Sequence, residues 1–139
     1  MPNNRRSFLS KLSLSGLAIG SLSISNIFAK SNVAKGDKVL VHQVYFWLKK
    51  DITPAQKAIF DKGVKSLITI KTVKYGDVGK PGATTDRPVI DKSYDYALLT
   101  VFEDVAGHDA YQIDPIHLQF LKDCKEFWDK VQVYDAATA

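Results

Sequence analysis

Cysteine and strongly apolar runs are scarce in this chain of 139 residues. The single cysteine, Cys124, excludes a disulfide framework and a cysteine-based zinc module of the chain's own. A membrane-spanning helix needs roughly 20 strongly apolar residues, whereas serines and glycines interrupt the uncharged stretch at 12–29. Hydrophobic residues still make up 45% of the chain, which is too apolar for a disordered protein. The length fits one domain, or one domain with a processed segment.

Acidic residues are missing from the first 29 positions, which carry Arg5, Arg6 and Lys11. A Ser-Phe-Leu sequence follows the paired arginines, and an uncharged stretch then runs to Ala29. A basic start, an uncharged middle and a small residue at the end are typical of an export signal. Paired arginines before Phe-Leu resemble the twin-arginine (Tat) signal. An amphipathic anchor or an uncleaved helix is the alternative interpretation.

Cleavage near Ala29 would remove three of the 19 basic residues and none of the 15 acidic ones. The remaining chain has a net charge near +1 and no run of lysine or arginine, so nucleic-acid binding is not expected. The residue directly after the expected cleavage point is Lys30 rather than cysteine, which excludes a lipoprotein. We expect the Tat export machinery as a partner, a periplasmic or exported location, and no stable membrane span in the processed protein. The expected organisation is a signal peptide at 1–29, a linker at 30–38, a domain at 39–135 and a tail at 136–139.

The processed chain predicts the order β-α-β-β-α-β. Thr53 before Pro54, with Gln56 in the third helical position, is typical of a helix start with a capping box. The order of elements indicates an α+β, ferredoxin-like domain, a four-stranded antiparallel sheet with helices on one face. Strands are predicted at 39–48, 73–78, 94–102 and 131–134, and helices at 54–68, 105–111 and 115–128.

The first predicted strand is apolar on both faces. Leu40 and Val44 lie on one face, while Val41, Tyr45 and Trp47 lie on the other. Helices on one side leave the second face exposed, although a strand that is apolar on both sides must be covered on both. A second copy of the chain is the simplest cover, so we expect a homodimer.

His117 lies on the apolar stripe of the last predicted helix, close to its N-terminus. His42 lies on the face of the first strand that is predicted to meet the helices, and Tyr111 can point into the same region. Burial and the helix dipole both favour a neutral imidazole. Such an imidazole can act as a general base while a phenol donates a hydrogen bond to a carbonyl. This pair suits enolisation, aldol closure or decarboxylation of a small hydrophobic ketone, with no metal or cofactor.

A structural interpretation of these residues stays open. His117 can be a core histidine bonded to Asp114 or to a carbonyl, and Tyr111 can simply close the core. His108 follows a glycine in a polar stretch and is expected on a solvated face. His117 and Cys124 are two potential metal ligands, and two do not make a site.

Residues 79–92 contain two prolines and few apolar side chains, so they predict a loop of the length that often serves as a lid or a binding loop. Arg87 is the sole arginine beyond the signal segment and lies in this loop. It can clamp an anion or be an ordinary exposed loop residue.

Three blocks of the sequence resemble the stress-responsive A/B barrel family, also called dimeric α/β barrel (Dabb) proteins. The blocks are 41–49, 52–57 and 111–117, of which the last, with its Tyr…Pro-x-His pattern, is the most specific. The resemblance covers residues 39–135 and implies a dimer whose two sheets pack face to face as a barrel. The family includes plant stress proteins without a settled activity and a plant polyketide cyclase that closes an aromatic ring without a cofactor.

In that cyclase, the positions that match Tyr111 and His117 are the catalytic pair. Asp114 stands where the family often has a histidine, and the 79–92 loop departs from the cyclase. We therefore expect an exported Dabb homodimer that binds a small apolar or aromatic molecule. Two alternatives are a cofactor-independent, cyclase-like lyase or isomerase with His117 as base and Tyr111 as hydrogen-bond donor, and a structural stress protein that acts through its assembly. The resemblance implies pocket positions at His42, Phe60, Phe120 and Trp128, and at Tyr96, which replaces a pocket histidine of the cyclase.

Overall fold

The computed structural model describes residues 38–138, so the predicted signal peptide and nearly all of the predicted linker lie outside the described residues. Within this range the chain has a ferredoxin-like α+β fold, as predicted. Among the described helices, none combines the length and apolarity that crossing a membrane requires. The elements are β1 (Leu40–Leu48), α1 (Pro54–Ser66), η2 (Leu67–Thr69), β2 (Val73–Gly79), β3 (Tyr96–Phe102), α2 (Val105–Gln112), α3 (Pro115–Cys124), η3 (Lys125–Phe127) and β4 (Trp128–Ala137).

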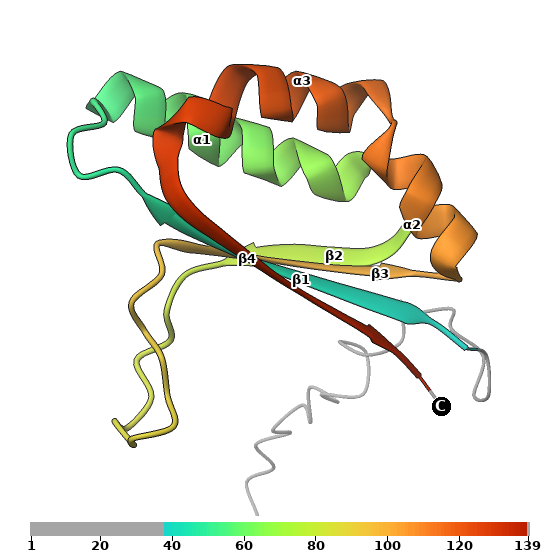
Figure 1. The fold of residues 1–139 in the computed structure, drawn as a ribbon, viewed down its shortest axis with the longest axis horizontal. Helices are drawn as coiled ribbons and strands as arrows, with labels where there is room; N and C mark the ends of the chain where they lie inside the picture. The colour runs from blue at the N-terminus through green and yellow to red at the C-terminus, as the bar shows by residue number, and fades with distance from the viewer. Residues whose placement is uncertain (1–37, 139) are drawn as a thin grey trace, which may run out of the picture. The chain divides into compact units, whose positions relative to one another are not determined.

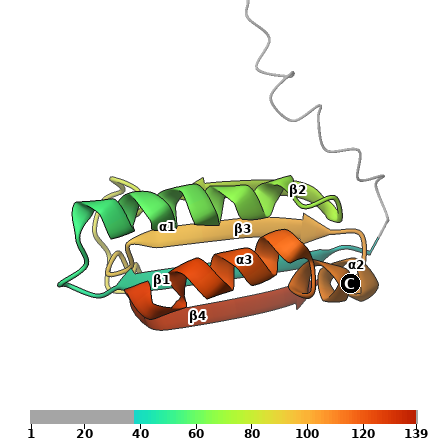
Figure 2. The ribbon, with the colours of Figure 1, turned by 90° about the horizontal axis from the view of Figure 1, so that it is seen from above.

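The four strands form an antiparallel sheet in the order β2-β3-β1-β4. All three α-helices lie on one face of this sheet (Figure 1). Seen from above, α1 and α3 run side by side across it (Figure 2). In the centre of the sheet β1 pairs with both β3 and β4, which places His42 opposite Thr100 on one side and opposite Asp135 on the other.

The start of α1 follows the predicted capping box. The Gln56 backbone N–H donates to Thr53 Oγ1 at 3.2 Å, and the Thr53 backbone N–H donates to Gln56 Oε1 at 2.8 Å. Pro54 occupies the first helical position, where its missing N–H costs no intrahelical bond. These local interactions determine where α1 begins.

The predicted end of the last helix at Trp128 is wrong. The α-helix ends at Cys124, a 3₁₀ turn follows, and Trp128 is the first residue of β4. The backbone N–H of Lys49 donates to the Phe127 carbonyl at 2.9 Å, which ties this turn to the end of β1. Strand β4 then pairs with β1 as far as Ala137, three residues past the predicted strand end. Pairing along the free edge of β1 therefore overrides the helical periodicity.

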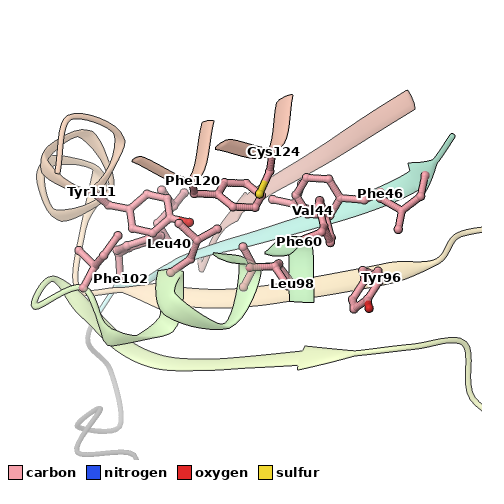
Figure 3. Packing of buried hydrophobic residues seen from close by; sticks show 14 residues of the cluster. Leu40, Val44, Phe46, Phe60, Tyr96, Leu98, Phe102, Tyr111, Phe120 and Cys124 are labelled. Atoms are coloured by element: carbon pink, nitrogen blue, oxygen red, sulfur yellow. The ribbon is translucent and has the colours of Figure 1, made fainter. Parts of the chain in front are cut away.

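Alternate residues of β1 point into the core beneath the helices. Leu40, Val44 and Phe46 are buried there, whereas Val41 and Tyr45 on the opposite face are half-buried. The core continues across α1, α3 and β3, as Figure 3 shows. Its side chains thereby fill the space between the sheet and one layer of helices.

The face of the sheet opposite the helices carries a broad apolar surface. Tyr45 and Trp47 of β1 and Leu99 and Val101 of β3 are half-buried on it. The segment between β2 and β3 projects on this same side (Figure 1). The ring of Tyr94, which precedes β3 rather than belonging to it as predicted, packs edge-on against Tyr45 with 4.9 Å between the ring centroids. This surface is accordingly shaped by the sheet and by the loop together.

Candidate functional site

Three histidines and one tyrosine lie close together beneath α2 and the start of α3. The Tyr111 ring centroid is 4.8 Å from that of His117 and 6.0 Å from that of His42. The His42 ring is in turn 5.0 Å from the His108 ring. We call these four residues the histidine–tyrosine cluster. Strand β1 supplies one of its members, α2 two, and α3 the fourth.

Two helix caps place Tyr111 and His117 against each other. Asp104 caps α2 by accepting the Gly107 backbone N–H at 2.7 Å, and Asp114 caps α3 by accepting the Ile116 N–H at 2.8 Å. Tyr111 lies near the end of α2, while His117 lies in the first turn of α3. The break between the two helices lets both side chains turn towards the sheet.

One ring nitrogen of His117 is buried without a hydrogen-bond partner. Its Nδ1 is inaccessible to solvent and has no hydrogen-bond partner among residues 38–138. Burial is the main cause that lowers the pKa of His117, and the neighbouring His42 and His108 lower it further. The backbone of Gln112 and the Asp114 carboxylate oppose this shift. The imidazole is therefore held in its neutral form.

Tyr111 is the complementary donor. Its side chain is almost completely buried, with 1% of its surface exposed. This burial raises the pKa of the phenol far above its ordinary value. The hydroxyl accordingly keeps its proton at physiological pH and can donate it in a hydrogen bond to a polarised oxygen.

His42 is paired with a residue that the sequence analysis did not consider. Its Nδ1 donates to Asp135 Oδ1 at 2.6 Å, across the register of β1 and β4. Burial lowers the pKa of His42, while the hydrogen bond and the charge of Asp135 act in the opposite direction. The Asp135 side chain is 45% exposed, so this edge of the cluster reaches solvent.

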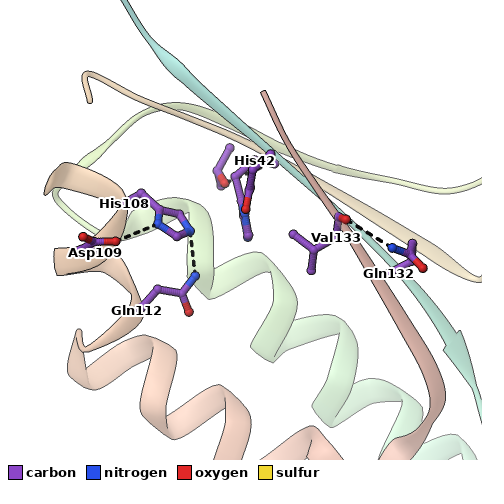
Figure 4. A network of polar contacts seen from close by, with 8 residues as sticks. His42, His108, Asp109, Gln112, Gln132 and Val133 are labelled. Carbon is purple, nitrogen blue, oxygen red and sulfur yellow. Dashed lines mark hydrogen bonds and ion pairs between the residues drawn. The ribbon is translucent and has the colours of Figure 1, made fainter. Parts of the chain in front are cut away.

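The expectation of a solvated His108 is wrong. Its side chain is only 16% exposed and faces His42 (Figure 4). Nδ1 of His108 lies 3.3 Å from Asp109 Oδ1, and Nε2 lies 3.0 Å from Gln112 Nε2. One pattern in the sequence could have revealed this placement, because His108 and Tyr111 are three residues apart and share a helix face.

The other predicted pocket residues gather in a second group around Phe46. Phe60, Tyr96, Phe120 and Trp128 are largely buried around Phe46, in the same hydrophobic core that contains Tyr111. The Phe60 ring is 5.3 Å from the Phe46 ring, and the Phe46 position lies about 13 Å along β1 from His42. The structure therefore brings together His42, Tyr111 and His117 and places the rest elsewhere. The second group consists of Phe60, Tyr96, Phe120 and Trp128.

A groove of about 540 Å³ runs between α1 and α3. Phe120 is among its lining residues, together with Ile59, Ile116 and Cys124. Burial raises the pKa of the Cys124 thiol to about 11, so this sulfur is an unreactive core atom. Arg87, which the sequence left as an anion clamp or a plain loop residue, is exposed in the segment between β2 and β3.

Comparison with known protein families gives one clear match. The family described as the Stress responsive A/B Barrel Domain matches residues 40–137, which is the whole of the folded region from β1 to β4. A comparison with the curated proteins finds no match. The family assignment therefore comes from the domain as a whole.

Solved structures of similar fold have low sequence identity to this chain. A dimeric ferredoxin-like protein of unknown function from Thermobifida fusca is 20% identical, with a TM-score of 0.61 over 78% of this chain and 98% of its own. A Dabb family protein from Mesorhizobium loti is 22% identical, with a TM-score of 0.58 over 73% and 98%. The hydroxynitrile lyase of Passiflora edulis is 18% identical, with a TM-score of 0.62 over 74% and 95%. At such identities the likeness establishes the fold.

Proposed function

The chain belongs to the stress-responsive A/B barrel (Dabb) family, and on this premise we propose that it is a homodimer that binds a small, largely apolar molecule at His42, Tyr111 and His117. The bound molecule carries a carbonyl or hydroxyl group, because the polar atoms of this site are one phenol and two imidazoles. The predicted signal at 1–29 delivers the protein out of the cytoplasm.

The observation that carries this proposal is the unpartnered Nδ1 of His117. Leaving a buried polar atom without a hydrogen bond costs roughly 1–3 kcal/mol. A ligand hydroxyl that donates to this nitrogen would recover that cost, and Tyr111 can donate to a second ligand oxygen. Ring edges of Phe102 and Tyr111 beside His42 supply apolar contact for the rest of the molecule.

Dimer formation is supported by the apolar sheet face. Tyr45, Trp47, Leu99 and Val101 form a surface that no helix of residues 38–138 covers. The structurally similar protein from Thermobifida fusca is described as dimeric. Packing of this face against its copy would build the two-sheet barrel after which the family is named.

Native mass spectrometry of protein purified from its own periplasm tests ligand binding. The expected spectrum shows a dimer that carries a small molecule, and the His117→Leu variant loses that molecule while it stays dimeric. The matched control is Leu118→Ala, at the exposed neighbouring position on α3, which keeps the ligand. A ligand-free dimer that also takes up no small aromatic ketone would contradict ligand binding and favour a role through assembly.

A second candidate, a cofactor-independent lyase or isomerase, is favoured by the 4.8 Å separation of the Tyr111 and His117 rings. His117 would remove a proton next to a carbonyl, Tyr111 would hold the enolate oxygen, and the imidazolium would return the proton. The hydroxynitrile lyase of Passiflora edulis has the same fold, so this fold accommodates lyase chemistry.

Deuterium exchange separates catalysis from simple binding. With acetophenone in D₂O, a catalytic protein exchanges the methyl hydrogens, and NMR follows their loss. His117→Gln abolishes the exchange and Tyr111→Phe slows it. Exchange by His117→Gln at the rate of the unaltered protein would rule out His117 as the base.

Export can be tested by following cleavage of the predicted signal and by substituting its paired arginines. Mass spectrometry of the periplasmic fraction is expected to show a chain without its first ~29 residues. Exchange of Arg5 and Arg6 for lysine retains the protein in the cytosol. An intact N-terminal segment on cytosolic protein of the unaltered sequence would contradict the proposal.

A further inference from the structure

We propose that His42, His108 and Asp135 bind one divalent transition-metal ion of the zinc class, through one nitrogen of each imidazole and a carboxylate oxygen. One potential ligand atom from each of the three residues lies within 4.8 Å of the other two. The site shares His42 with the ligand proposed above but adds two residues, His108 and Asp135, that lie outside that proposal.

The chemistry of the three donors fits such an ion. Zinc binds imidazole nitrogen and carboxylate oxygen at about 2.0–2.2 Å, so two of its ligands lie roughly 3–4 Å apart. Small side-chain rotations bring three atoms that are already within 4.8 Å to that spacing. Two imidazoles and one carboxylate also form the ligand set of many zinc and ferrous sites that keep open positions for water or substrate.

The three donors come from three separate elements, β1, α2 and β4. His42 and Asp135 are opposite each other on β1 and β4, and their 2.6 Å contact already joins a nitrogen and an oxygen ligand. His108 approaches from α2, with its ring centroid 5.0 Å from that of His42 (Figure 4). In this proposal the ion replaces the proton that His42 and Asp135 now share.

His108 also has an outer partner of the kind that metal-binding histidines use. Its Nδ1 lies 3.3 Å from Asp109 Oδ1 and its Nε2 lies 3.0 Å from Gln112 Nε2. When Nε2 binds the ion in place of its contact with Gln112, the Nδ1–H keeps the Asp109 carboxylate as its acceptor, which fixes the orientation and the tautomer of the ring. The sequence does not reveal this site, because its three residues are distant in the chain and only the fold brings them together.

The site is open on one side. The side chain of Asp135 is 45% exposed, whereas that of His42 is 6% exposed. An ion can therefore enter from solvent at the β4 edge and retain a position for water. Because the Tyr111 ring is 6.0 Å from that of His42, this water would lie close to Tyr111.

Zinc titration of the full chain, prepared without a histidine tag and stripped with a chelator, tests the site. Competition with a chromogenic chelator is expected to give one zinc per chain. His108→Gln and Asp135→Asn each weaken zinc binding by at least about tenfold, the loss that even outer partners of a metal site cause. Asp129→Asn, on the exposed start of the same strand, is the matched control and binds zinc as the unaltered chain does.

Cobalt provides a second readout that reports the ligands directly. The Co²⁺ form is expected to show visible absorption bands that His108→Gln and Asp135→Asn change, while circular dichroism shows that both variants remain folded. Absence of stoichiometric zinc binding, or unchanged affinity in both variants, would overturn the proposal. These outcomes do not depend on dimer formation or on an organic ligand, so they are distinct from failure of the proposed function.

Discussion

The ring of Tyr111 lies 4.8 Å from the ring of His117, although a break between two helices separates the residues in the chain. Two aspartate caps, Asp104 and Asp114, set the starts of these helices and so determine the approach of the two rings. The pair combines a neutral base with a protonated donor in a buried setting. The roles of the two residues can be measured through the free energy of unfolding as well as through catalytic activity.

His117 should make the protein less stable in mild acid. Its folded-state pKa lies below the ordinary 6.5, so between these two values the unfolded chain binds a proton that the folded chain does not. The free energy of unfolding contributed by this group is therefore complete above pH 6.5 and decreases as the pH falls towards the folded-state pKa. Urea unfolding at pH 7.5 and 5.5 should show a smaller decrease for His117→Gln than for the unaltered chain. Equal decreases would show that His117 is protonated alike in both states.

Gly63→Ala should destabilise the fold by about 1–3 kcal/mol, the usual cost of overpacking. A methyl group at this position would lie 3.0 Å from Phe120 Cδ2 and 3.2 Å from Cys124 Sγ, where α1 meets α3. Gly107→Ala is the matched control, because its added carbon meets only ordinary contacts from 3.4 Å and gains helix propensity. In thermal unfolding, Gly63→Ala should have a lower midpoint temperature than the unaltered chain, and Gly107→Ala should not. A stabilised Gly63→Ala protein would mean that the two helices lie farther apart than described.

Leu99→Asp should separate the dimer into monomers. The aspartate would place a charge in the middle of the apolar sheet face, and an unpaired charge is costly to bury. The control is Leu118→Asp, which carries the same change on the exposed surface of α3 and should leave the dimer intact. Light scattering of both variants gives the mass directly. A dimeric Leu99→Asp protein would place the interface on another surface.

Tyr111→Phe and His117→Gln should differ in their effects if the site is catalytic. Loss of a general base lowers turnover by roughly a hundredfold or more, whereas loss of the phenol weakens stabilisation of the developing charge. We expect Tyr111→Phe to retain measurable exchange of a ketone hydrogen and to keep the fold, since it leaves the aromatic contacts with Phe102 in place. Equal residual activity in the two variants would argue against separate roles.

Several features of the fold follow from neighbouring residues alone. The Thr53–Gln56 capping box and the Asp114–Pro115 helix start are visible in four or five residues, and both are present in the structure. Alternation along β1 likewise predicted that His42 shares the buried face. Such features were predictable because their hydrogen bonds and periodicities lie within a single element.

The end of α3 was not predictable in this way. Trp128 continues the helical spacing of His117, Phe120 and Cys124, so periodicity extends the helix too far. Pairing of Trp128 with Leu48 instead begins β4, a contact between residues distant in sequence. A local pattern contains no information about this competition.

The sequence by itself determined the order of elements, the helix starts, the buried face of β1 and the Tyr111 and His117 pair. Only the tertiary structure decided that Asp135 meets His42, because strand register is set by pairing between segments that are 93 residues apart. It also turned His108 inward and placed Phe60 and Phe120 around Phe46, in another part of the same core. The chemistry available to this protein therefore depends on the packing of α2 and β4 around one strand.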